Sequence, residues 1–479
     1  MDPAAIENAL EKKCKNHCWL VWILFLTASP TIVVGSHLVS YVFLGGNPSF
    51  FCNIPELVEA NWTKEQIREI SSPGLAKQSC VHYAWNYSIL KDLDFNDALS
   101  YCNTSQKPDL VKCKNYIYDE EVVHQTIVSK WDLVCDDLPL RSTAQSSVAV
   151  GKVIGAVLLG MLSDRYGRKK VFIFSSILFW VAGPSAAFVD SYIMFIAFRL
   201  MIGIAGSGLY ETAYTILLEL TVKTYRAYLA NIFNLAFSCG LLQLSILAYL
   251  TNDWRQLQLA ISIPMVLLVI HCWFLPESPR WLITSGKLEK ASKIIGSAWR
   301  LVPIDPDHTP QLVLKHQPGS SGKSLLFFLK DYLKLFSTFE LTKRTLICNY
   351  LWFMGNLYYF VISWPIICVS LVGRLVLASA YGIIMFYTIE LYPTENRNTA
   401  MGSCITTSQF GPMLAPYIVD ILGKIVWWLP TALSGSLALL GAFLLTFLPE
   451  TRNTPMLDTI CEMKDLERED LRNDVRRSS

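Results

Sequence analysis

Two charged residues stand inside long runs of apolar residues, where a charge is costly. Lys152 lies midway along one run, and Glu211 lies well inside a later one. An ionised side chain at the centre of a membrane helix costs on the order of 3 kcal/mol, so it is functional by default. Two interpretations follow. Either the two side chains face and neutralise each other, or Glu211 is a counter-ion for a cationic substrate.

This pattern indicates ion recognition rather than catalysis. The sequence has no histidine or cysteine cluster with metal-ligand spacing, no nucleophile elbow and no phosphate-binding loop. The glycines of Gly203-x-x-Gly206-x-Gly208 lie inside an apolar run, where small residues let helices pack closely in lipid. We therefore predict a protein that is not an enzyme and that holds no metal or cofactor.

The composition predicts a multi-pass, all-α membrane protein. Of the 479 residues, 52% are hydrophobic and 17% are charged, and the mean hydropathy is +0.35. Soluble domains carry about 25% charged residues. The net charge of +2 gives no reason to expect a nucleic-acid partner. The predicted partner is the lipid bilayer, and the sequence does not indicate an oligomeric state.

Apolar runs of membrane-spanning length divide the chain into two helical bundles. We expect ten spans, at Cys18–Gly45, about 144–162, 171–189, about 192–218, about 228–250, about 256–275, 346–363, 366–391, 400–422 and about 426–448. The regions are a cytoplasmic N-terminus (1–17), a six-helix bundle (18–275) that includes an extracellular loop (46–143), a cytoplasmic linker (276–345), a shortened second bundle (346–449) and a cytoplasmic tail (450–479).

The extracellular loop has the features of a segment that matures in an oxidising compartment. It contains five cysteines and three glycosylation sequons, namely Cys52, Cys80, Cys102, Cys113 and Cys135, and Asn61, Asn86 and Asn103. Clustered cysteines beside Asn-x-Ser/Thr sequons are typical of extracellular segments. Because five is odd, at most two disulfides form within the loop and one thiol is left over. The sequence does not give the pairing.

A short basic turn joins the second and third spans. It reads Gly160-Met-Leu-Ser-Asp-Arg-Tyr-Gly-Arg-Lys-Lys170, and its basic side should face the cytoplasm. The two glycines permit close backbone approach and a tight turn. Asp164 is placed to accept hydrogen bonds from a neighbouring helix N-terminus. Arg165 and Arg168 are placed to pair with carboxylates on another helix.

An internal repeat relates the two halves of the chain. The pattern Glu219-Leu-x5-Arg226 recurs as Glu390-Leu-x5-Arg397, and Phe274-Leu-Pro-Glu-Ser278 recurs as Phe447-Leu-Pro-Glu-Thr451. The carboxylates of the two patterns are 58 residues apart in the first half and 60 in the second. Two matches in register indicate a duplicated helical bundle.

The basic turn resembles the loop between helices 2 and 3 of the major facilitator superfamily. Together with the repeat, the glycosylated loop and Pro276-Glu-Ser-Pro-Arg-Trp-Leu282, it makes the chain resemble the solute-carrier family of organic cation, anion and zwitterion transporters. The resemblance runs from about residue 18 to 300 and from about 370 to 460. It implies two pseudo-repeated bundles, a substrate site at the midplane, alternating access and a place in the plasma membrane.

The second half departs from the family pattern after Phe360. Ser363-Trp-Pro365 runs almost directly into Gly373-Arg374, where family members continue through the rest of helix 7 and then helices 8 and 9. The resemblance therefore implies about ten helices instead of the family's twelve. A bundle short of two helices puts transport itself in doubt.

The resemblance also implies two sets of functional residues. The predicted substrate-binding residues are Lys152, Tyr210, Glu211, Tyr214, Trp352, Tyr359, Phe360 and Gln409. The predicted gating residues at the cytoplasmic edge are Gly160, Asp164, Arg165, Gly167, Arg168, Glu219, Arg226, Glu277, Arg280, Glu390 and Arg397. Aromatic faces attract organic cations through cation–π contacts, which favours the tyrosines as cavity residues.

Several functions remain open at this stage. Glu211 favours organic cations or zwitterions, whereas Lys152 keeps an organic anion carrier as an alternative. Gln409 occupies the helix 11 position that tends to be Asp in cation carriers and Arg in anion carriers, and a neutral amide decides neither sign. A transport-incompetent isoform with a regulatory role is the alternative from another class. A sugar porter is a weaker one.

Overall fold

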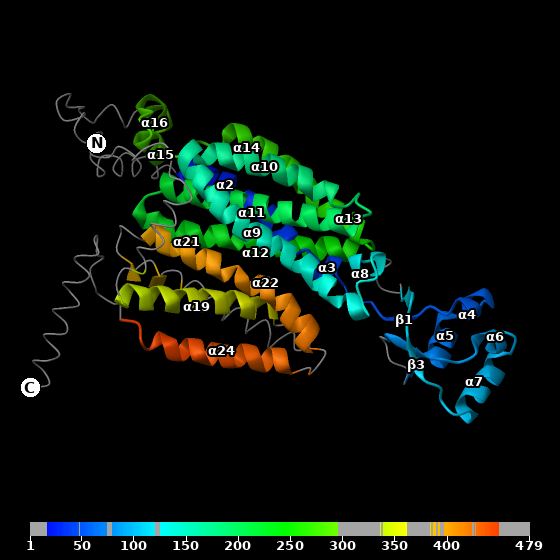
Figure 1. Cartoon of the computed structure of the whole chain (residues 1–479). Helices are drawn as coiled ribbons and strands as arrows, with labels where there is room; N and C mark the ends of the chain where they lie inside the picture. The colour runs from blue at the N-terminus through cyan, green and yellow to red at the C-terminus, as the bar shows by residue number, and fades with distance from the viewer. Residues whose placement is uncertain are drawn as a thin grey trace, which may run out of the picture.

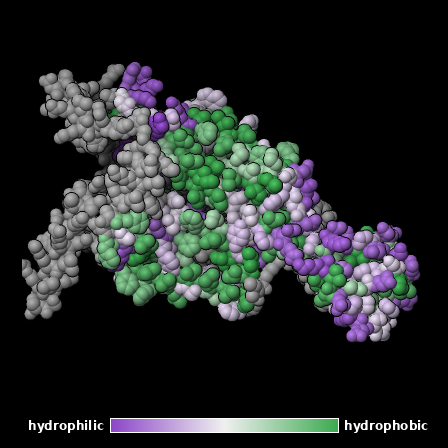
Figure 2. Space-filling view, viewed as in Figure 1, coloured by the Kyte–Doolittle hydropathy of each residue, from purple (hydrophilic) through white to green (hydrophobic). Residues whose placement is uncertain are grey.

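The computed structural model is a bundle of long helices with a small domain at one end (Figure 1). It describes residues 17–295 apart from residue 47 and the segments 74–78 and 120–124, and then residues 336, 339–361, 384, 387, 388, 391, 392, 397–423, 426 and 428–449. Five helices in this part of the chain are long and apolar enough to cross a membrane. In Figure 2 an apolar surface covers the middle of the molecule, and hydrophilic residues gather on the small domain.

The first half of the chain forms the larger part of the bundle. Its helices are α2 (His17–Val39), α3 (Tyr41–Leu44), α9 (Leu138–Tyr166), α10 (Arg168–Ser185), α11 (Tyr192–Leu220), α12 (Lys223–Leu250), α13 (Trp254–Ser262), η3 (Ile263–Leu267) and α14 (Leu268–Phe274). Two short helices follow, α15 (Pro279–Thr284) and α16 (Leu288–Ile295). Pro264 lies in the 3-10 segment η3, where it divides the expected sixth span into α13 and α14.

The second half is described in fewer pieces. These are α19 (Phe339–Val361), α21 (Arg397–Ser408), α22 (Phe410–Tyr417), the π-helix η5 (Ile418–Leu422) and α24 (Leu429–Leu445). α21, α22 and η5 follow one another along the expected span 400–422, with breaks at Gln409 and at the π-helix. The expected span 366–391 lies almost entirely outside the described residues, and so does most of the expected linker.

Glycines bring α9 and α11 into direct backbone contact. A Cβ added to Gly203 would lie 2.2 Å from the carbonyl oxygen of Val148, and one added to Gly151 would lie 2.2 Å from that of Leu200. Side chains larger than hydrogen do not fit at such crossings, as is usual for helix pairs in membranes. The same arrangement joins α2 to α12, where a Cβ on Gly240 would lie 2.1 Å from the oxygen of Ile32.

The small domain is built from short elements around its own apolar core. They are β1 (Phe50–Cys52), α4 (Pro55–Glu59), α5 (Lys64–Ser71), β2 (Val81–Tyr83), α6 (Tyr87–Leu90), α7 (Phe95–Thr104), β3 (Leu110–Lys112), β4 (Tyr116–Tyr118), α8 (Ile127–Lys130) and the 3-10 turn η2 (Cys135–Asp137). β1 pairs antiparallel with β4, and β2 pairs antiparallel with β3, so that Phe51 lies opposite Ile117 and His82 opposite Val111. The core includes Leu57, Ile67 and Ala98.

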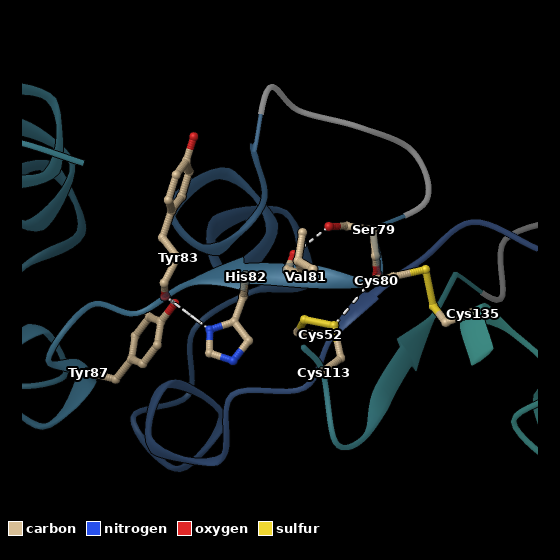
Figure 3. The surroundings of a disulfide bond; sticks show 9 residues. All are labelled: Cys52, Ser79, Cys80, Val81, His82, Tyr83, Tyr87, Cys113 and Cys135. Atoms are coloured by element: carbon tan, nitrogen blue, oxygen red, sulfur yellow. Dashed lines mark hydrogen bonds between the residues drawn. A yellow bond between two sulfur atoms is a disulfide. The ribbon is translucent and has the colours of Figure 1, made fainter. Parts of the chain in front are cut away.

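Two disulfides connect this domain across its sheets (Figure 3). Cys52 is bonded to Cys113, and Cys80 is bonded to Cys135. The remaining cysteine of the loop, Cys102, is a buried free thiol in α7. The expectation of two disulfides and one unpaired thiol is therefore confirmed. The three sequon asparagines are all exposed, which makes them accessible to glycosylation.

The small domain is attached firmly to the first half of the bundle. Trp131, which follows α8, packs against Phe195 of α11 and Trp254 of α13, with ring centroids 5.0 and 5.6 Å away. Asp190 pairs with Arg255 at 2.7 Å and with Lys130 at 3.3 Å. These hydrogen bonds to cations hold the pKa of the Asp190 carboxyl below its usual value. The domain and the first half therefore form one unit.

Candidate substrate pathway and gates

Lys152 and Glu211 lie on the two helices that touch through glycine. Lys152 follows Gly151 on α9, and Glu211 lies two turns beyond Gly203 on α11. Both side chains are half-buried, and the two charges attract each other. Glu211 also accepts a hydrogen bond from Ser207 Oγ at 2.9 Å. These two helices thus place a cation and an anion on adjoining positions within the first half.

Lys152 lines a small cavity between the two halves of the chain. The cavity has a volume of about 40 Å³, and its wall includes Tyr41 beside α2, Gln145 of α9 and Pro412 of α22. Such a volume holds one or two water molecules. An organic ion does not fit there in this conformation.

The two predicted tyrosines of α11 form an aromatic surface with a third ring. Tyr210 and Tyr214 stack at 6.4 Å between centroids with 11° between planes. Phe233 of α12 contacts both rings at 5.2 Å. Tyr210 Oη donates a hydrogen bond to Asn234 Oδ1 at 2.8 Å, so its hydroxyl is engaged by α12. Both tyrosines are half-buried, and their role in substrate binding stays a prediction.

The predicted residues of the second half lie in different surroundings. Trp352 is 1% exposed, and its Nε1 donates to Thr388 Oγ1 at 3.2 Å. Gln409 is 6% exposed and marks the break between α21 and α22; its Nε2 donates to Ser408 Oγ at 3.1 Å, while no described residue donates to its Oε1. The side chains of Tyr359 and Phe360 lie outside the described residues.

The predicted cytoplasmic residues of the first half do form a polar network. Arg168 Nη2 pairs with Glu219 on α11 at 3.3 Å and with Asp164 on α9 at 3.0 Å. Glu277 Oε1 accepts from the backbone N–H of Arg168 at 3.0 Å and of Lys169 at 3.2 Å. A carboxylate at this position interacts favourably with the N-terminus of α10. The network ties α9, α10 and α11 to the segment after α14.

The assignment of Asp164 to a helix N-terminus is wrong. Glu277 takes that place, because Gly167 has a φ of +106° and turns the backbone so that the first N–H groups of α10 point at Glu277. A Cβ on Gly167 would lie 2.5 Å from Glu277 Oε2. Asp164 is linked to this region differently, since its backbone oxygen accepts from Trp281 Nε1 at 2.8 Å.

The remaining gating residues are placed less completely. Arg165 lies over the ring of Tyr166, 5.4 Å from its centroid, and so contacts an aromatic ring on its own helix. A Cβ at Gly160 would lie 4.0 Å from Glu211 Oε2. The first residue of the basic turn therefore lies close to the carboxylate of Glu211. Arg280 is half-buried beside this network in α15. Glu390 and the side chains of Arg226 and Arg397 lie outside the described residues.

A set of contacts that the sequence pattern did not predict lies at the opposite end of the bundle. Ser142 Oγ donates to Asp420 Oδ2 at 3.0 Å, and Arg141 Nη1 lies 3.8 Å from Asp420 Oδ1. Ser146 Oγ donates to the backbone oxygen of Met413 at 2.7 Å. These contacts join the start of α9 to α22 and η5, and so connect the two halves. The sequence feature that could have identified Asp420 is its charge near the end of an apolar run.

Arg199, which was not among the predicted site residues, is a fully buried charge on α11. Its Nη1 donates to Ser40 Oγ at 2.9 Å, and its guanidinium lies 5.8 Å from the ring centroid of Tyr41. Neither its Nε nor its Nη2 has a hydrogen-bond partner among the described residues. The signal that identified Lys152, a charge within an apolar run, applies equally to Arg199.

Comparison with known proteins agrees with this arrangement. The sequence model of the family described as Sugar (and other) transporter matches residues 136–364. An organic cation transporter protein of Drosophila melanogaster is 28% identical over 91% of this chain and 90% of its own length. Solute carrier family 22 member 16 of Bos taurus is 27% identical over 92% of this chain and 90% of its own length. Along about nine-tenths of its length, this chain is similar to members of solute carrier family 22.

The fold of the chain is that of the major facilitator superfamily. The structure of the proton:xylose symporter XylE bound to 6-bromo-6-deoxy-D-glucose matches with a TM-score of 0.50 at 16% identity, over 92% of this chain and 98% of the symporter. The all-α transmembrane fold expected from the sequence is thereby confirmed. The chain is a transporter of small molecules and not an enzyme.

The chain is shorter than the Drosophila protein within the matched region. The alignment with the Drosophila protein runs over 509 positions, and 91% of the 479 residues here is about 436, so about 70 positions stand opposite gaps in this chain. That number of residues is enough for two membrane helices and their connections. The loss of helices 8 and 9 that the sequence predicts after Phe360 would produce a gap of this size.

Proposed function

We propose that this protein carries a small organic ion with a cationic ammonium group, either an organic cation or a zwitterion, across the plasma membrane by alternating access. The observation behind this proposal is the pair of opposite intramembrane charges, Lys152 and Glu211, on adjoining helices. A carboxylate inside a membrane bundle attracts an ammonium group. The aromatic rings of Tyr210 and Tyr214, one turn apart on the same helix, supply the cation–π faces.

The same pair explains why a zwitterion is an attractive substrate. A molecule with an ammonium and a carboxylate can satisfy Glu211 and Lys152 together and leave neither charge unpaired. A simple cation takes Glu211 away from Lys152 and leaves the lysine without its attraction. A substrate that replaces the internal pair on both sides avoids that desolvation cost.

An organic anion is the second candidate, because cationic groups are prominent in the described spans. Lys152 lines the cavity between the halves, and Arg199 is a second buried cation without a described carboxylate partner. Arg199 is fully buried within the first half, whereas Lys152 reaches the cavity wall. A transport-incompetent isoform remains the alternative from another class.

Uptake by cells that express the full chain tests these alternatives. Three labelled probes are compared: a quaternary ammonium, a trimethylammonium carboxylate and an aromatic carboxylate. Surface biotinylation measures the transporter present. In Glu211→Gln, uptake of the first two should fall at least about tenfold, which corresponds to about 1.4 kcal/mol of lost interaction. Glu289→Gln, on the exposed helix α16, is the matched control and should leave uptake unchanged.

Each other outcome excludes part of the proposal. Uptake of the aromatic carboxylate alone, lost in Lys152→Met and kept in Glu211→Gln, would establish an anion carrier. Equal uptake of the ammonium probes by wild type and Glu211→Gln would remove Glu211 from the site. Surface protein that takes up none of the three probes would favour the transport-incompetent isoform.

A further inference from the structure

The contacts between α9 and η5 lie at the extracellular end of the pathway. α9 begins at Leu138, directly after the disulfide-bonded domain, and Arg141 and Ser142 occupy its first turns. Asp420 lies in the π-helix η5, at the end of the helix that begins with α21. In Figure 1 the orange end of the α22 segment and the start of α9 both lie on the side of the small domain.

The side of these contacts that belongs to the first half is held in place by its own helices. Tyr41 Oη donates to the backbone oxygen of Arg141 at 2.7 Å. Arg141 Nη2 donates to the backbone oxygen of Gly45 at 3.3 Å. Tyr41 is 6% exposed, and a Cβ on Gly45 would lie 2.6 Å from its ring. Arg141 is therefore oriented by residues of its own half, whether or not the second half is in contact.

The second half contributes the carboxylate of Asp420 and the hydroxyl of Tyr417. The Asp420 carboxylate accepts from Ser142 at 3.0 Å and lies 3.8 Å from Arg141, and its side chain is 14% exposed against 16% for Arg141. Tyr417 Oη and Thr143 Oγ1 lie 3.0 Å apart in a further hydrogen bond. Hydrogen bonds to charged groups are stronger than those between neutral groups, particularly when water is partly excluded.

We propose that Arg141 and Ser142 form an extracellular latch with Asp420, which holds the transporter closed to the outside. Directly below the latch lies the cavity of about 40 Å³ that Lys152 and Gln145 line, so the closed latch leaves no room for an organic ion to reach Lys152 from this side. Opening to the outside requires that Asp420 leave Arg141. The role of the latch in transport rests on the proposed function. Whether the latch is closed can be measured separately, from the accessibility of the cavity to a reagent outside the cell.

The test measures accessibility and does not need a substrate. Gln145→Cys places a thiol in the wall of the cavity below the latch. Cells that express this variant are treated with a membrane-impermeant methanethiosulfonate carrying a quaternary ammonium, and the parent chain gives the background. Adding Asp420→Asn should raise the labelling rate of the introduced thiol at least tenfold, because the latch loses its charge. Asp136→Asn, which removes an exposed carboxylate paired with Lys112 in the extracellular domain, should leave the rate unchanged.

Two further variants keep the test decisive. Arg141→Asp combined with Asp420→Arg reverses the pair and should return the rate toward that of the closed form. Ser142→Ala removes one hydrogen bond and should raise the rate by less than Asp420→Asn does. If Asp420→Asn fails to reach the surface, the labelling rates of Ser142→Ala and of the reversed pair test the latch instead. Equal labelling rates in the latch variants and in Asp136→Asn would overturn the latch.

The result is independent of the proposed substrate. A variant series that labels as expected while no probe is taken up supports the latch and contradicts the proposed function. Uptake of a probe with no effect of the latch variants on labelling supports the function and overturns the latch.

Discussion

The contact between α9 and α11 predicts a sharp difference between two alanine substitutions one turn apart. A Cβ at Gly203 would lie 2.2 Å from the carbonyl oxygen of Val148 and 3.0 Å from Gly151 Cα. A Cβ at Gly206 would meet its nearest neighbour, a ring carbon of Phe179, at 3.5 Å. The first substitution requires the two helix backbones to separate. The second fills ordinary space.

The expected magnitude follows from these distances. Gly206→Ala should be neutral or should stabilise by up to about 1 kcal/mol, because alanine is the better helix residue. Gly203→Ala should cost about 1–3 kcal/mol, the usual range for overpacking a close-packed interior. The two variants therefore differ by about 1–4 kcal/mol. At about 2–4 °C of melting temperature per kcal/mol, the value for a domain of 150–250 residues, this corresponds to a difference of about 2–16 °C, and to the lower part of that range in a longer chain.

The assay is the thermal stability of detergent-purified protein, followed by size-exclusion of a fluorescent fusion after heating. Uptake should fall in Gly203→Ala as well, because moving α9 away from α11 displaces Lys152 from Glu211, and a shift of about 1 Å in a binding site is enough to impair function. Equal melting temperatures for the two variants would refute the inferred backbone contact. A lower melting temperature for Gly206→Ala than for Gly203→Ala would contradict the inference that Gly203 lies at the closer contact.

Two other experiments test the two ends of the molecule. Gly167→Ala should lower stability and uptake, because a positive φ disfavours alanine and its Cβ would lie 2.5 Å from Glu277 Oε2. Gly286→Ala is the control, since Gly286 also has a positive φ but has open space around it. The loss of stability in Gly286→Ala measures the backbone strain alone, and the additional loss in Gly167→Ala measures the clash with Glu277. In the small domain, burial raises the pKa of the Cys102 thiol, so it should react with maleimide at pH 8 only after denaturation. Mass spectrometry of the alkylated protein checks this, and rapid labelling of the native protein would contradict it.

The sequence was sufficient for the fold because the determining signals are local. Long apolar runs identify membrane helices, and the repeat of Glu219 and Arg226 at Glu390 and Arg397 identifies two related halves. The disulfide pairing needed the structure. Cys52 and Cys113 are 61 residues apart, and which cysteines meet depends on how β1 pairs with β4 and β2 with β3.

The candidate site was predicted less completely because it depends on tertiary contacts. The sequence placed Arg168 to pair with a carboxylate on another helix, and the structure shows that this carboxylate is Glu219. It gave Asp164 the place at a helix N-terminus that Glu277 takes, because the direction of the α10 N-terminus follows from the left-handed backbone at Gly167. Asp420 acquires its importance only from the opposing first turns of α9. No property of its own helix reveals that neighbour.

The segmentation of α21, α22 and η5 bears on how fast the outer gate moves and on what resists it. A continuous helix transmits motion along its whole length, so its outer end opens only when the bundle tilts and displaces lipid. A helix with breaks at Gln409 and at Ile418–Leu422 can bend locally. Local bending displaces little lipid, so the opening rate should depend weakly on bilayer thickness and viscosity. A carrier with a shortened second half would keep a working outer gate in this way.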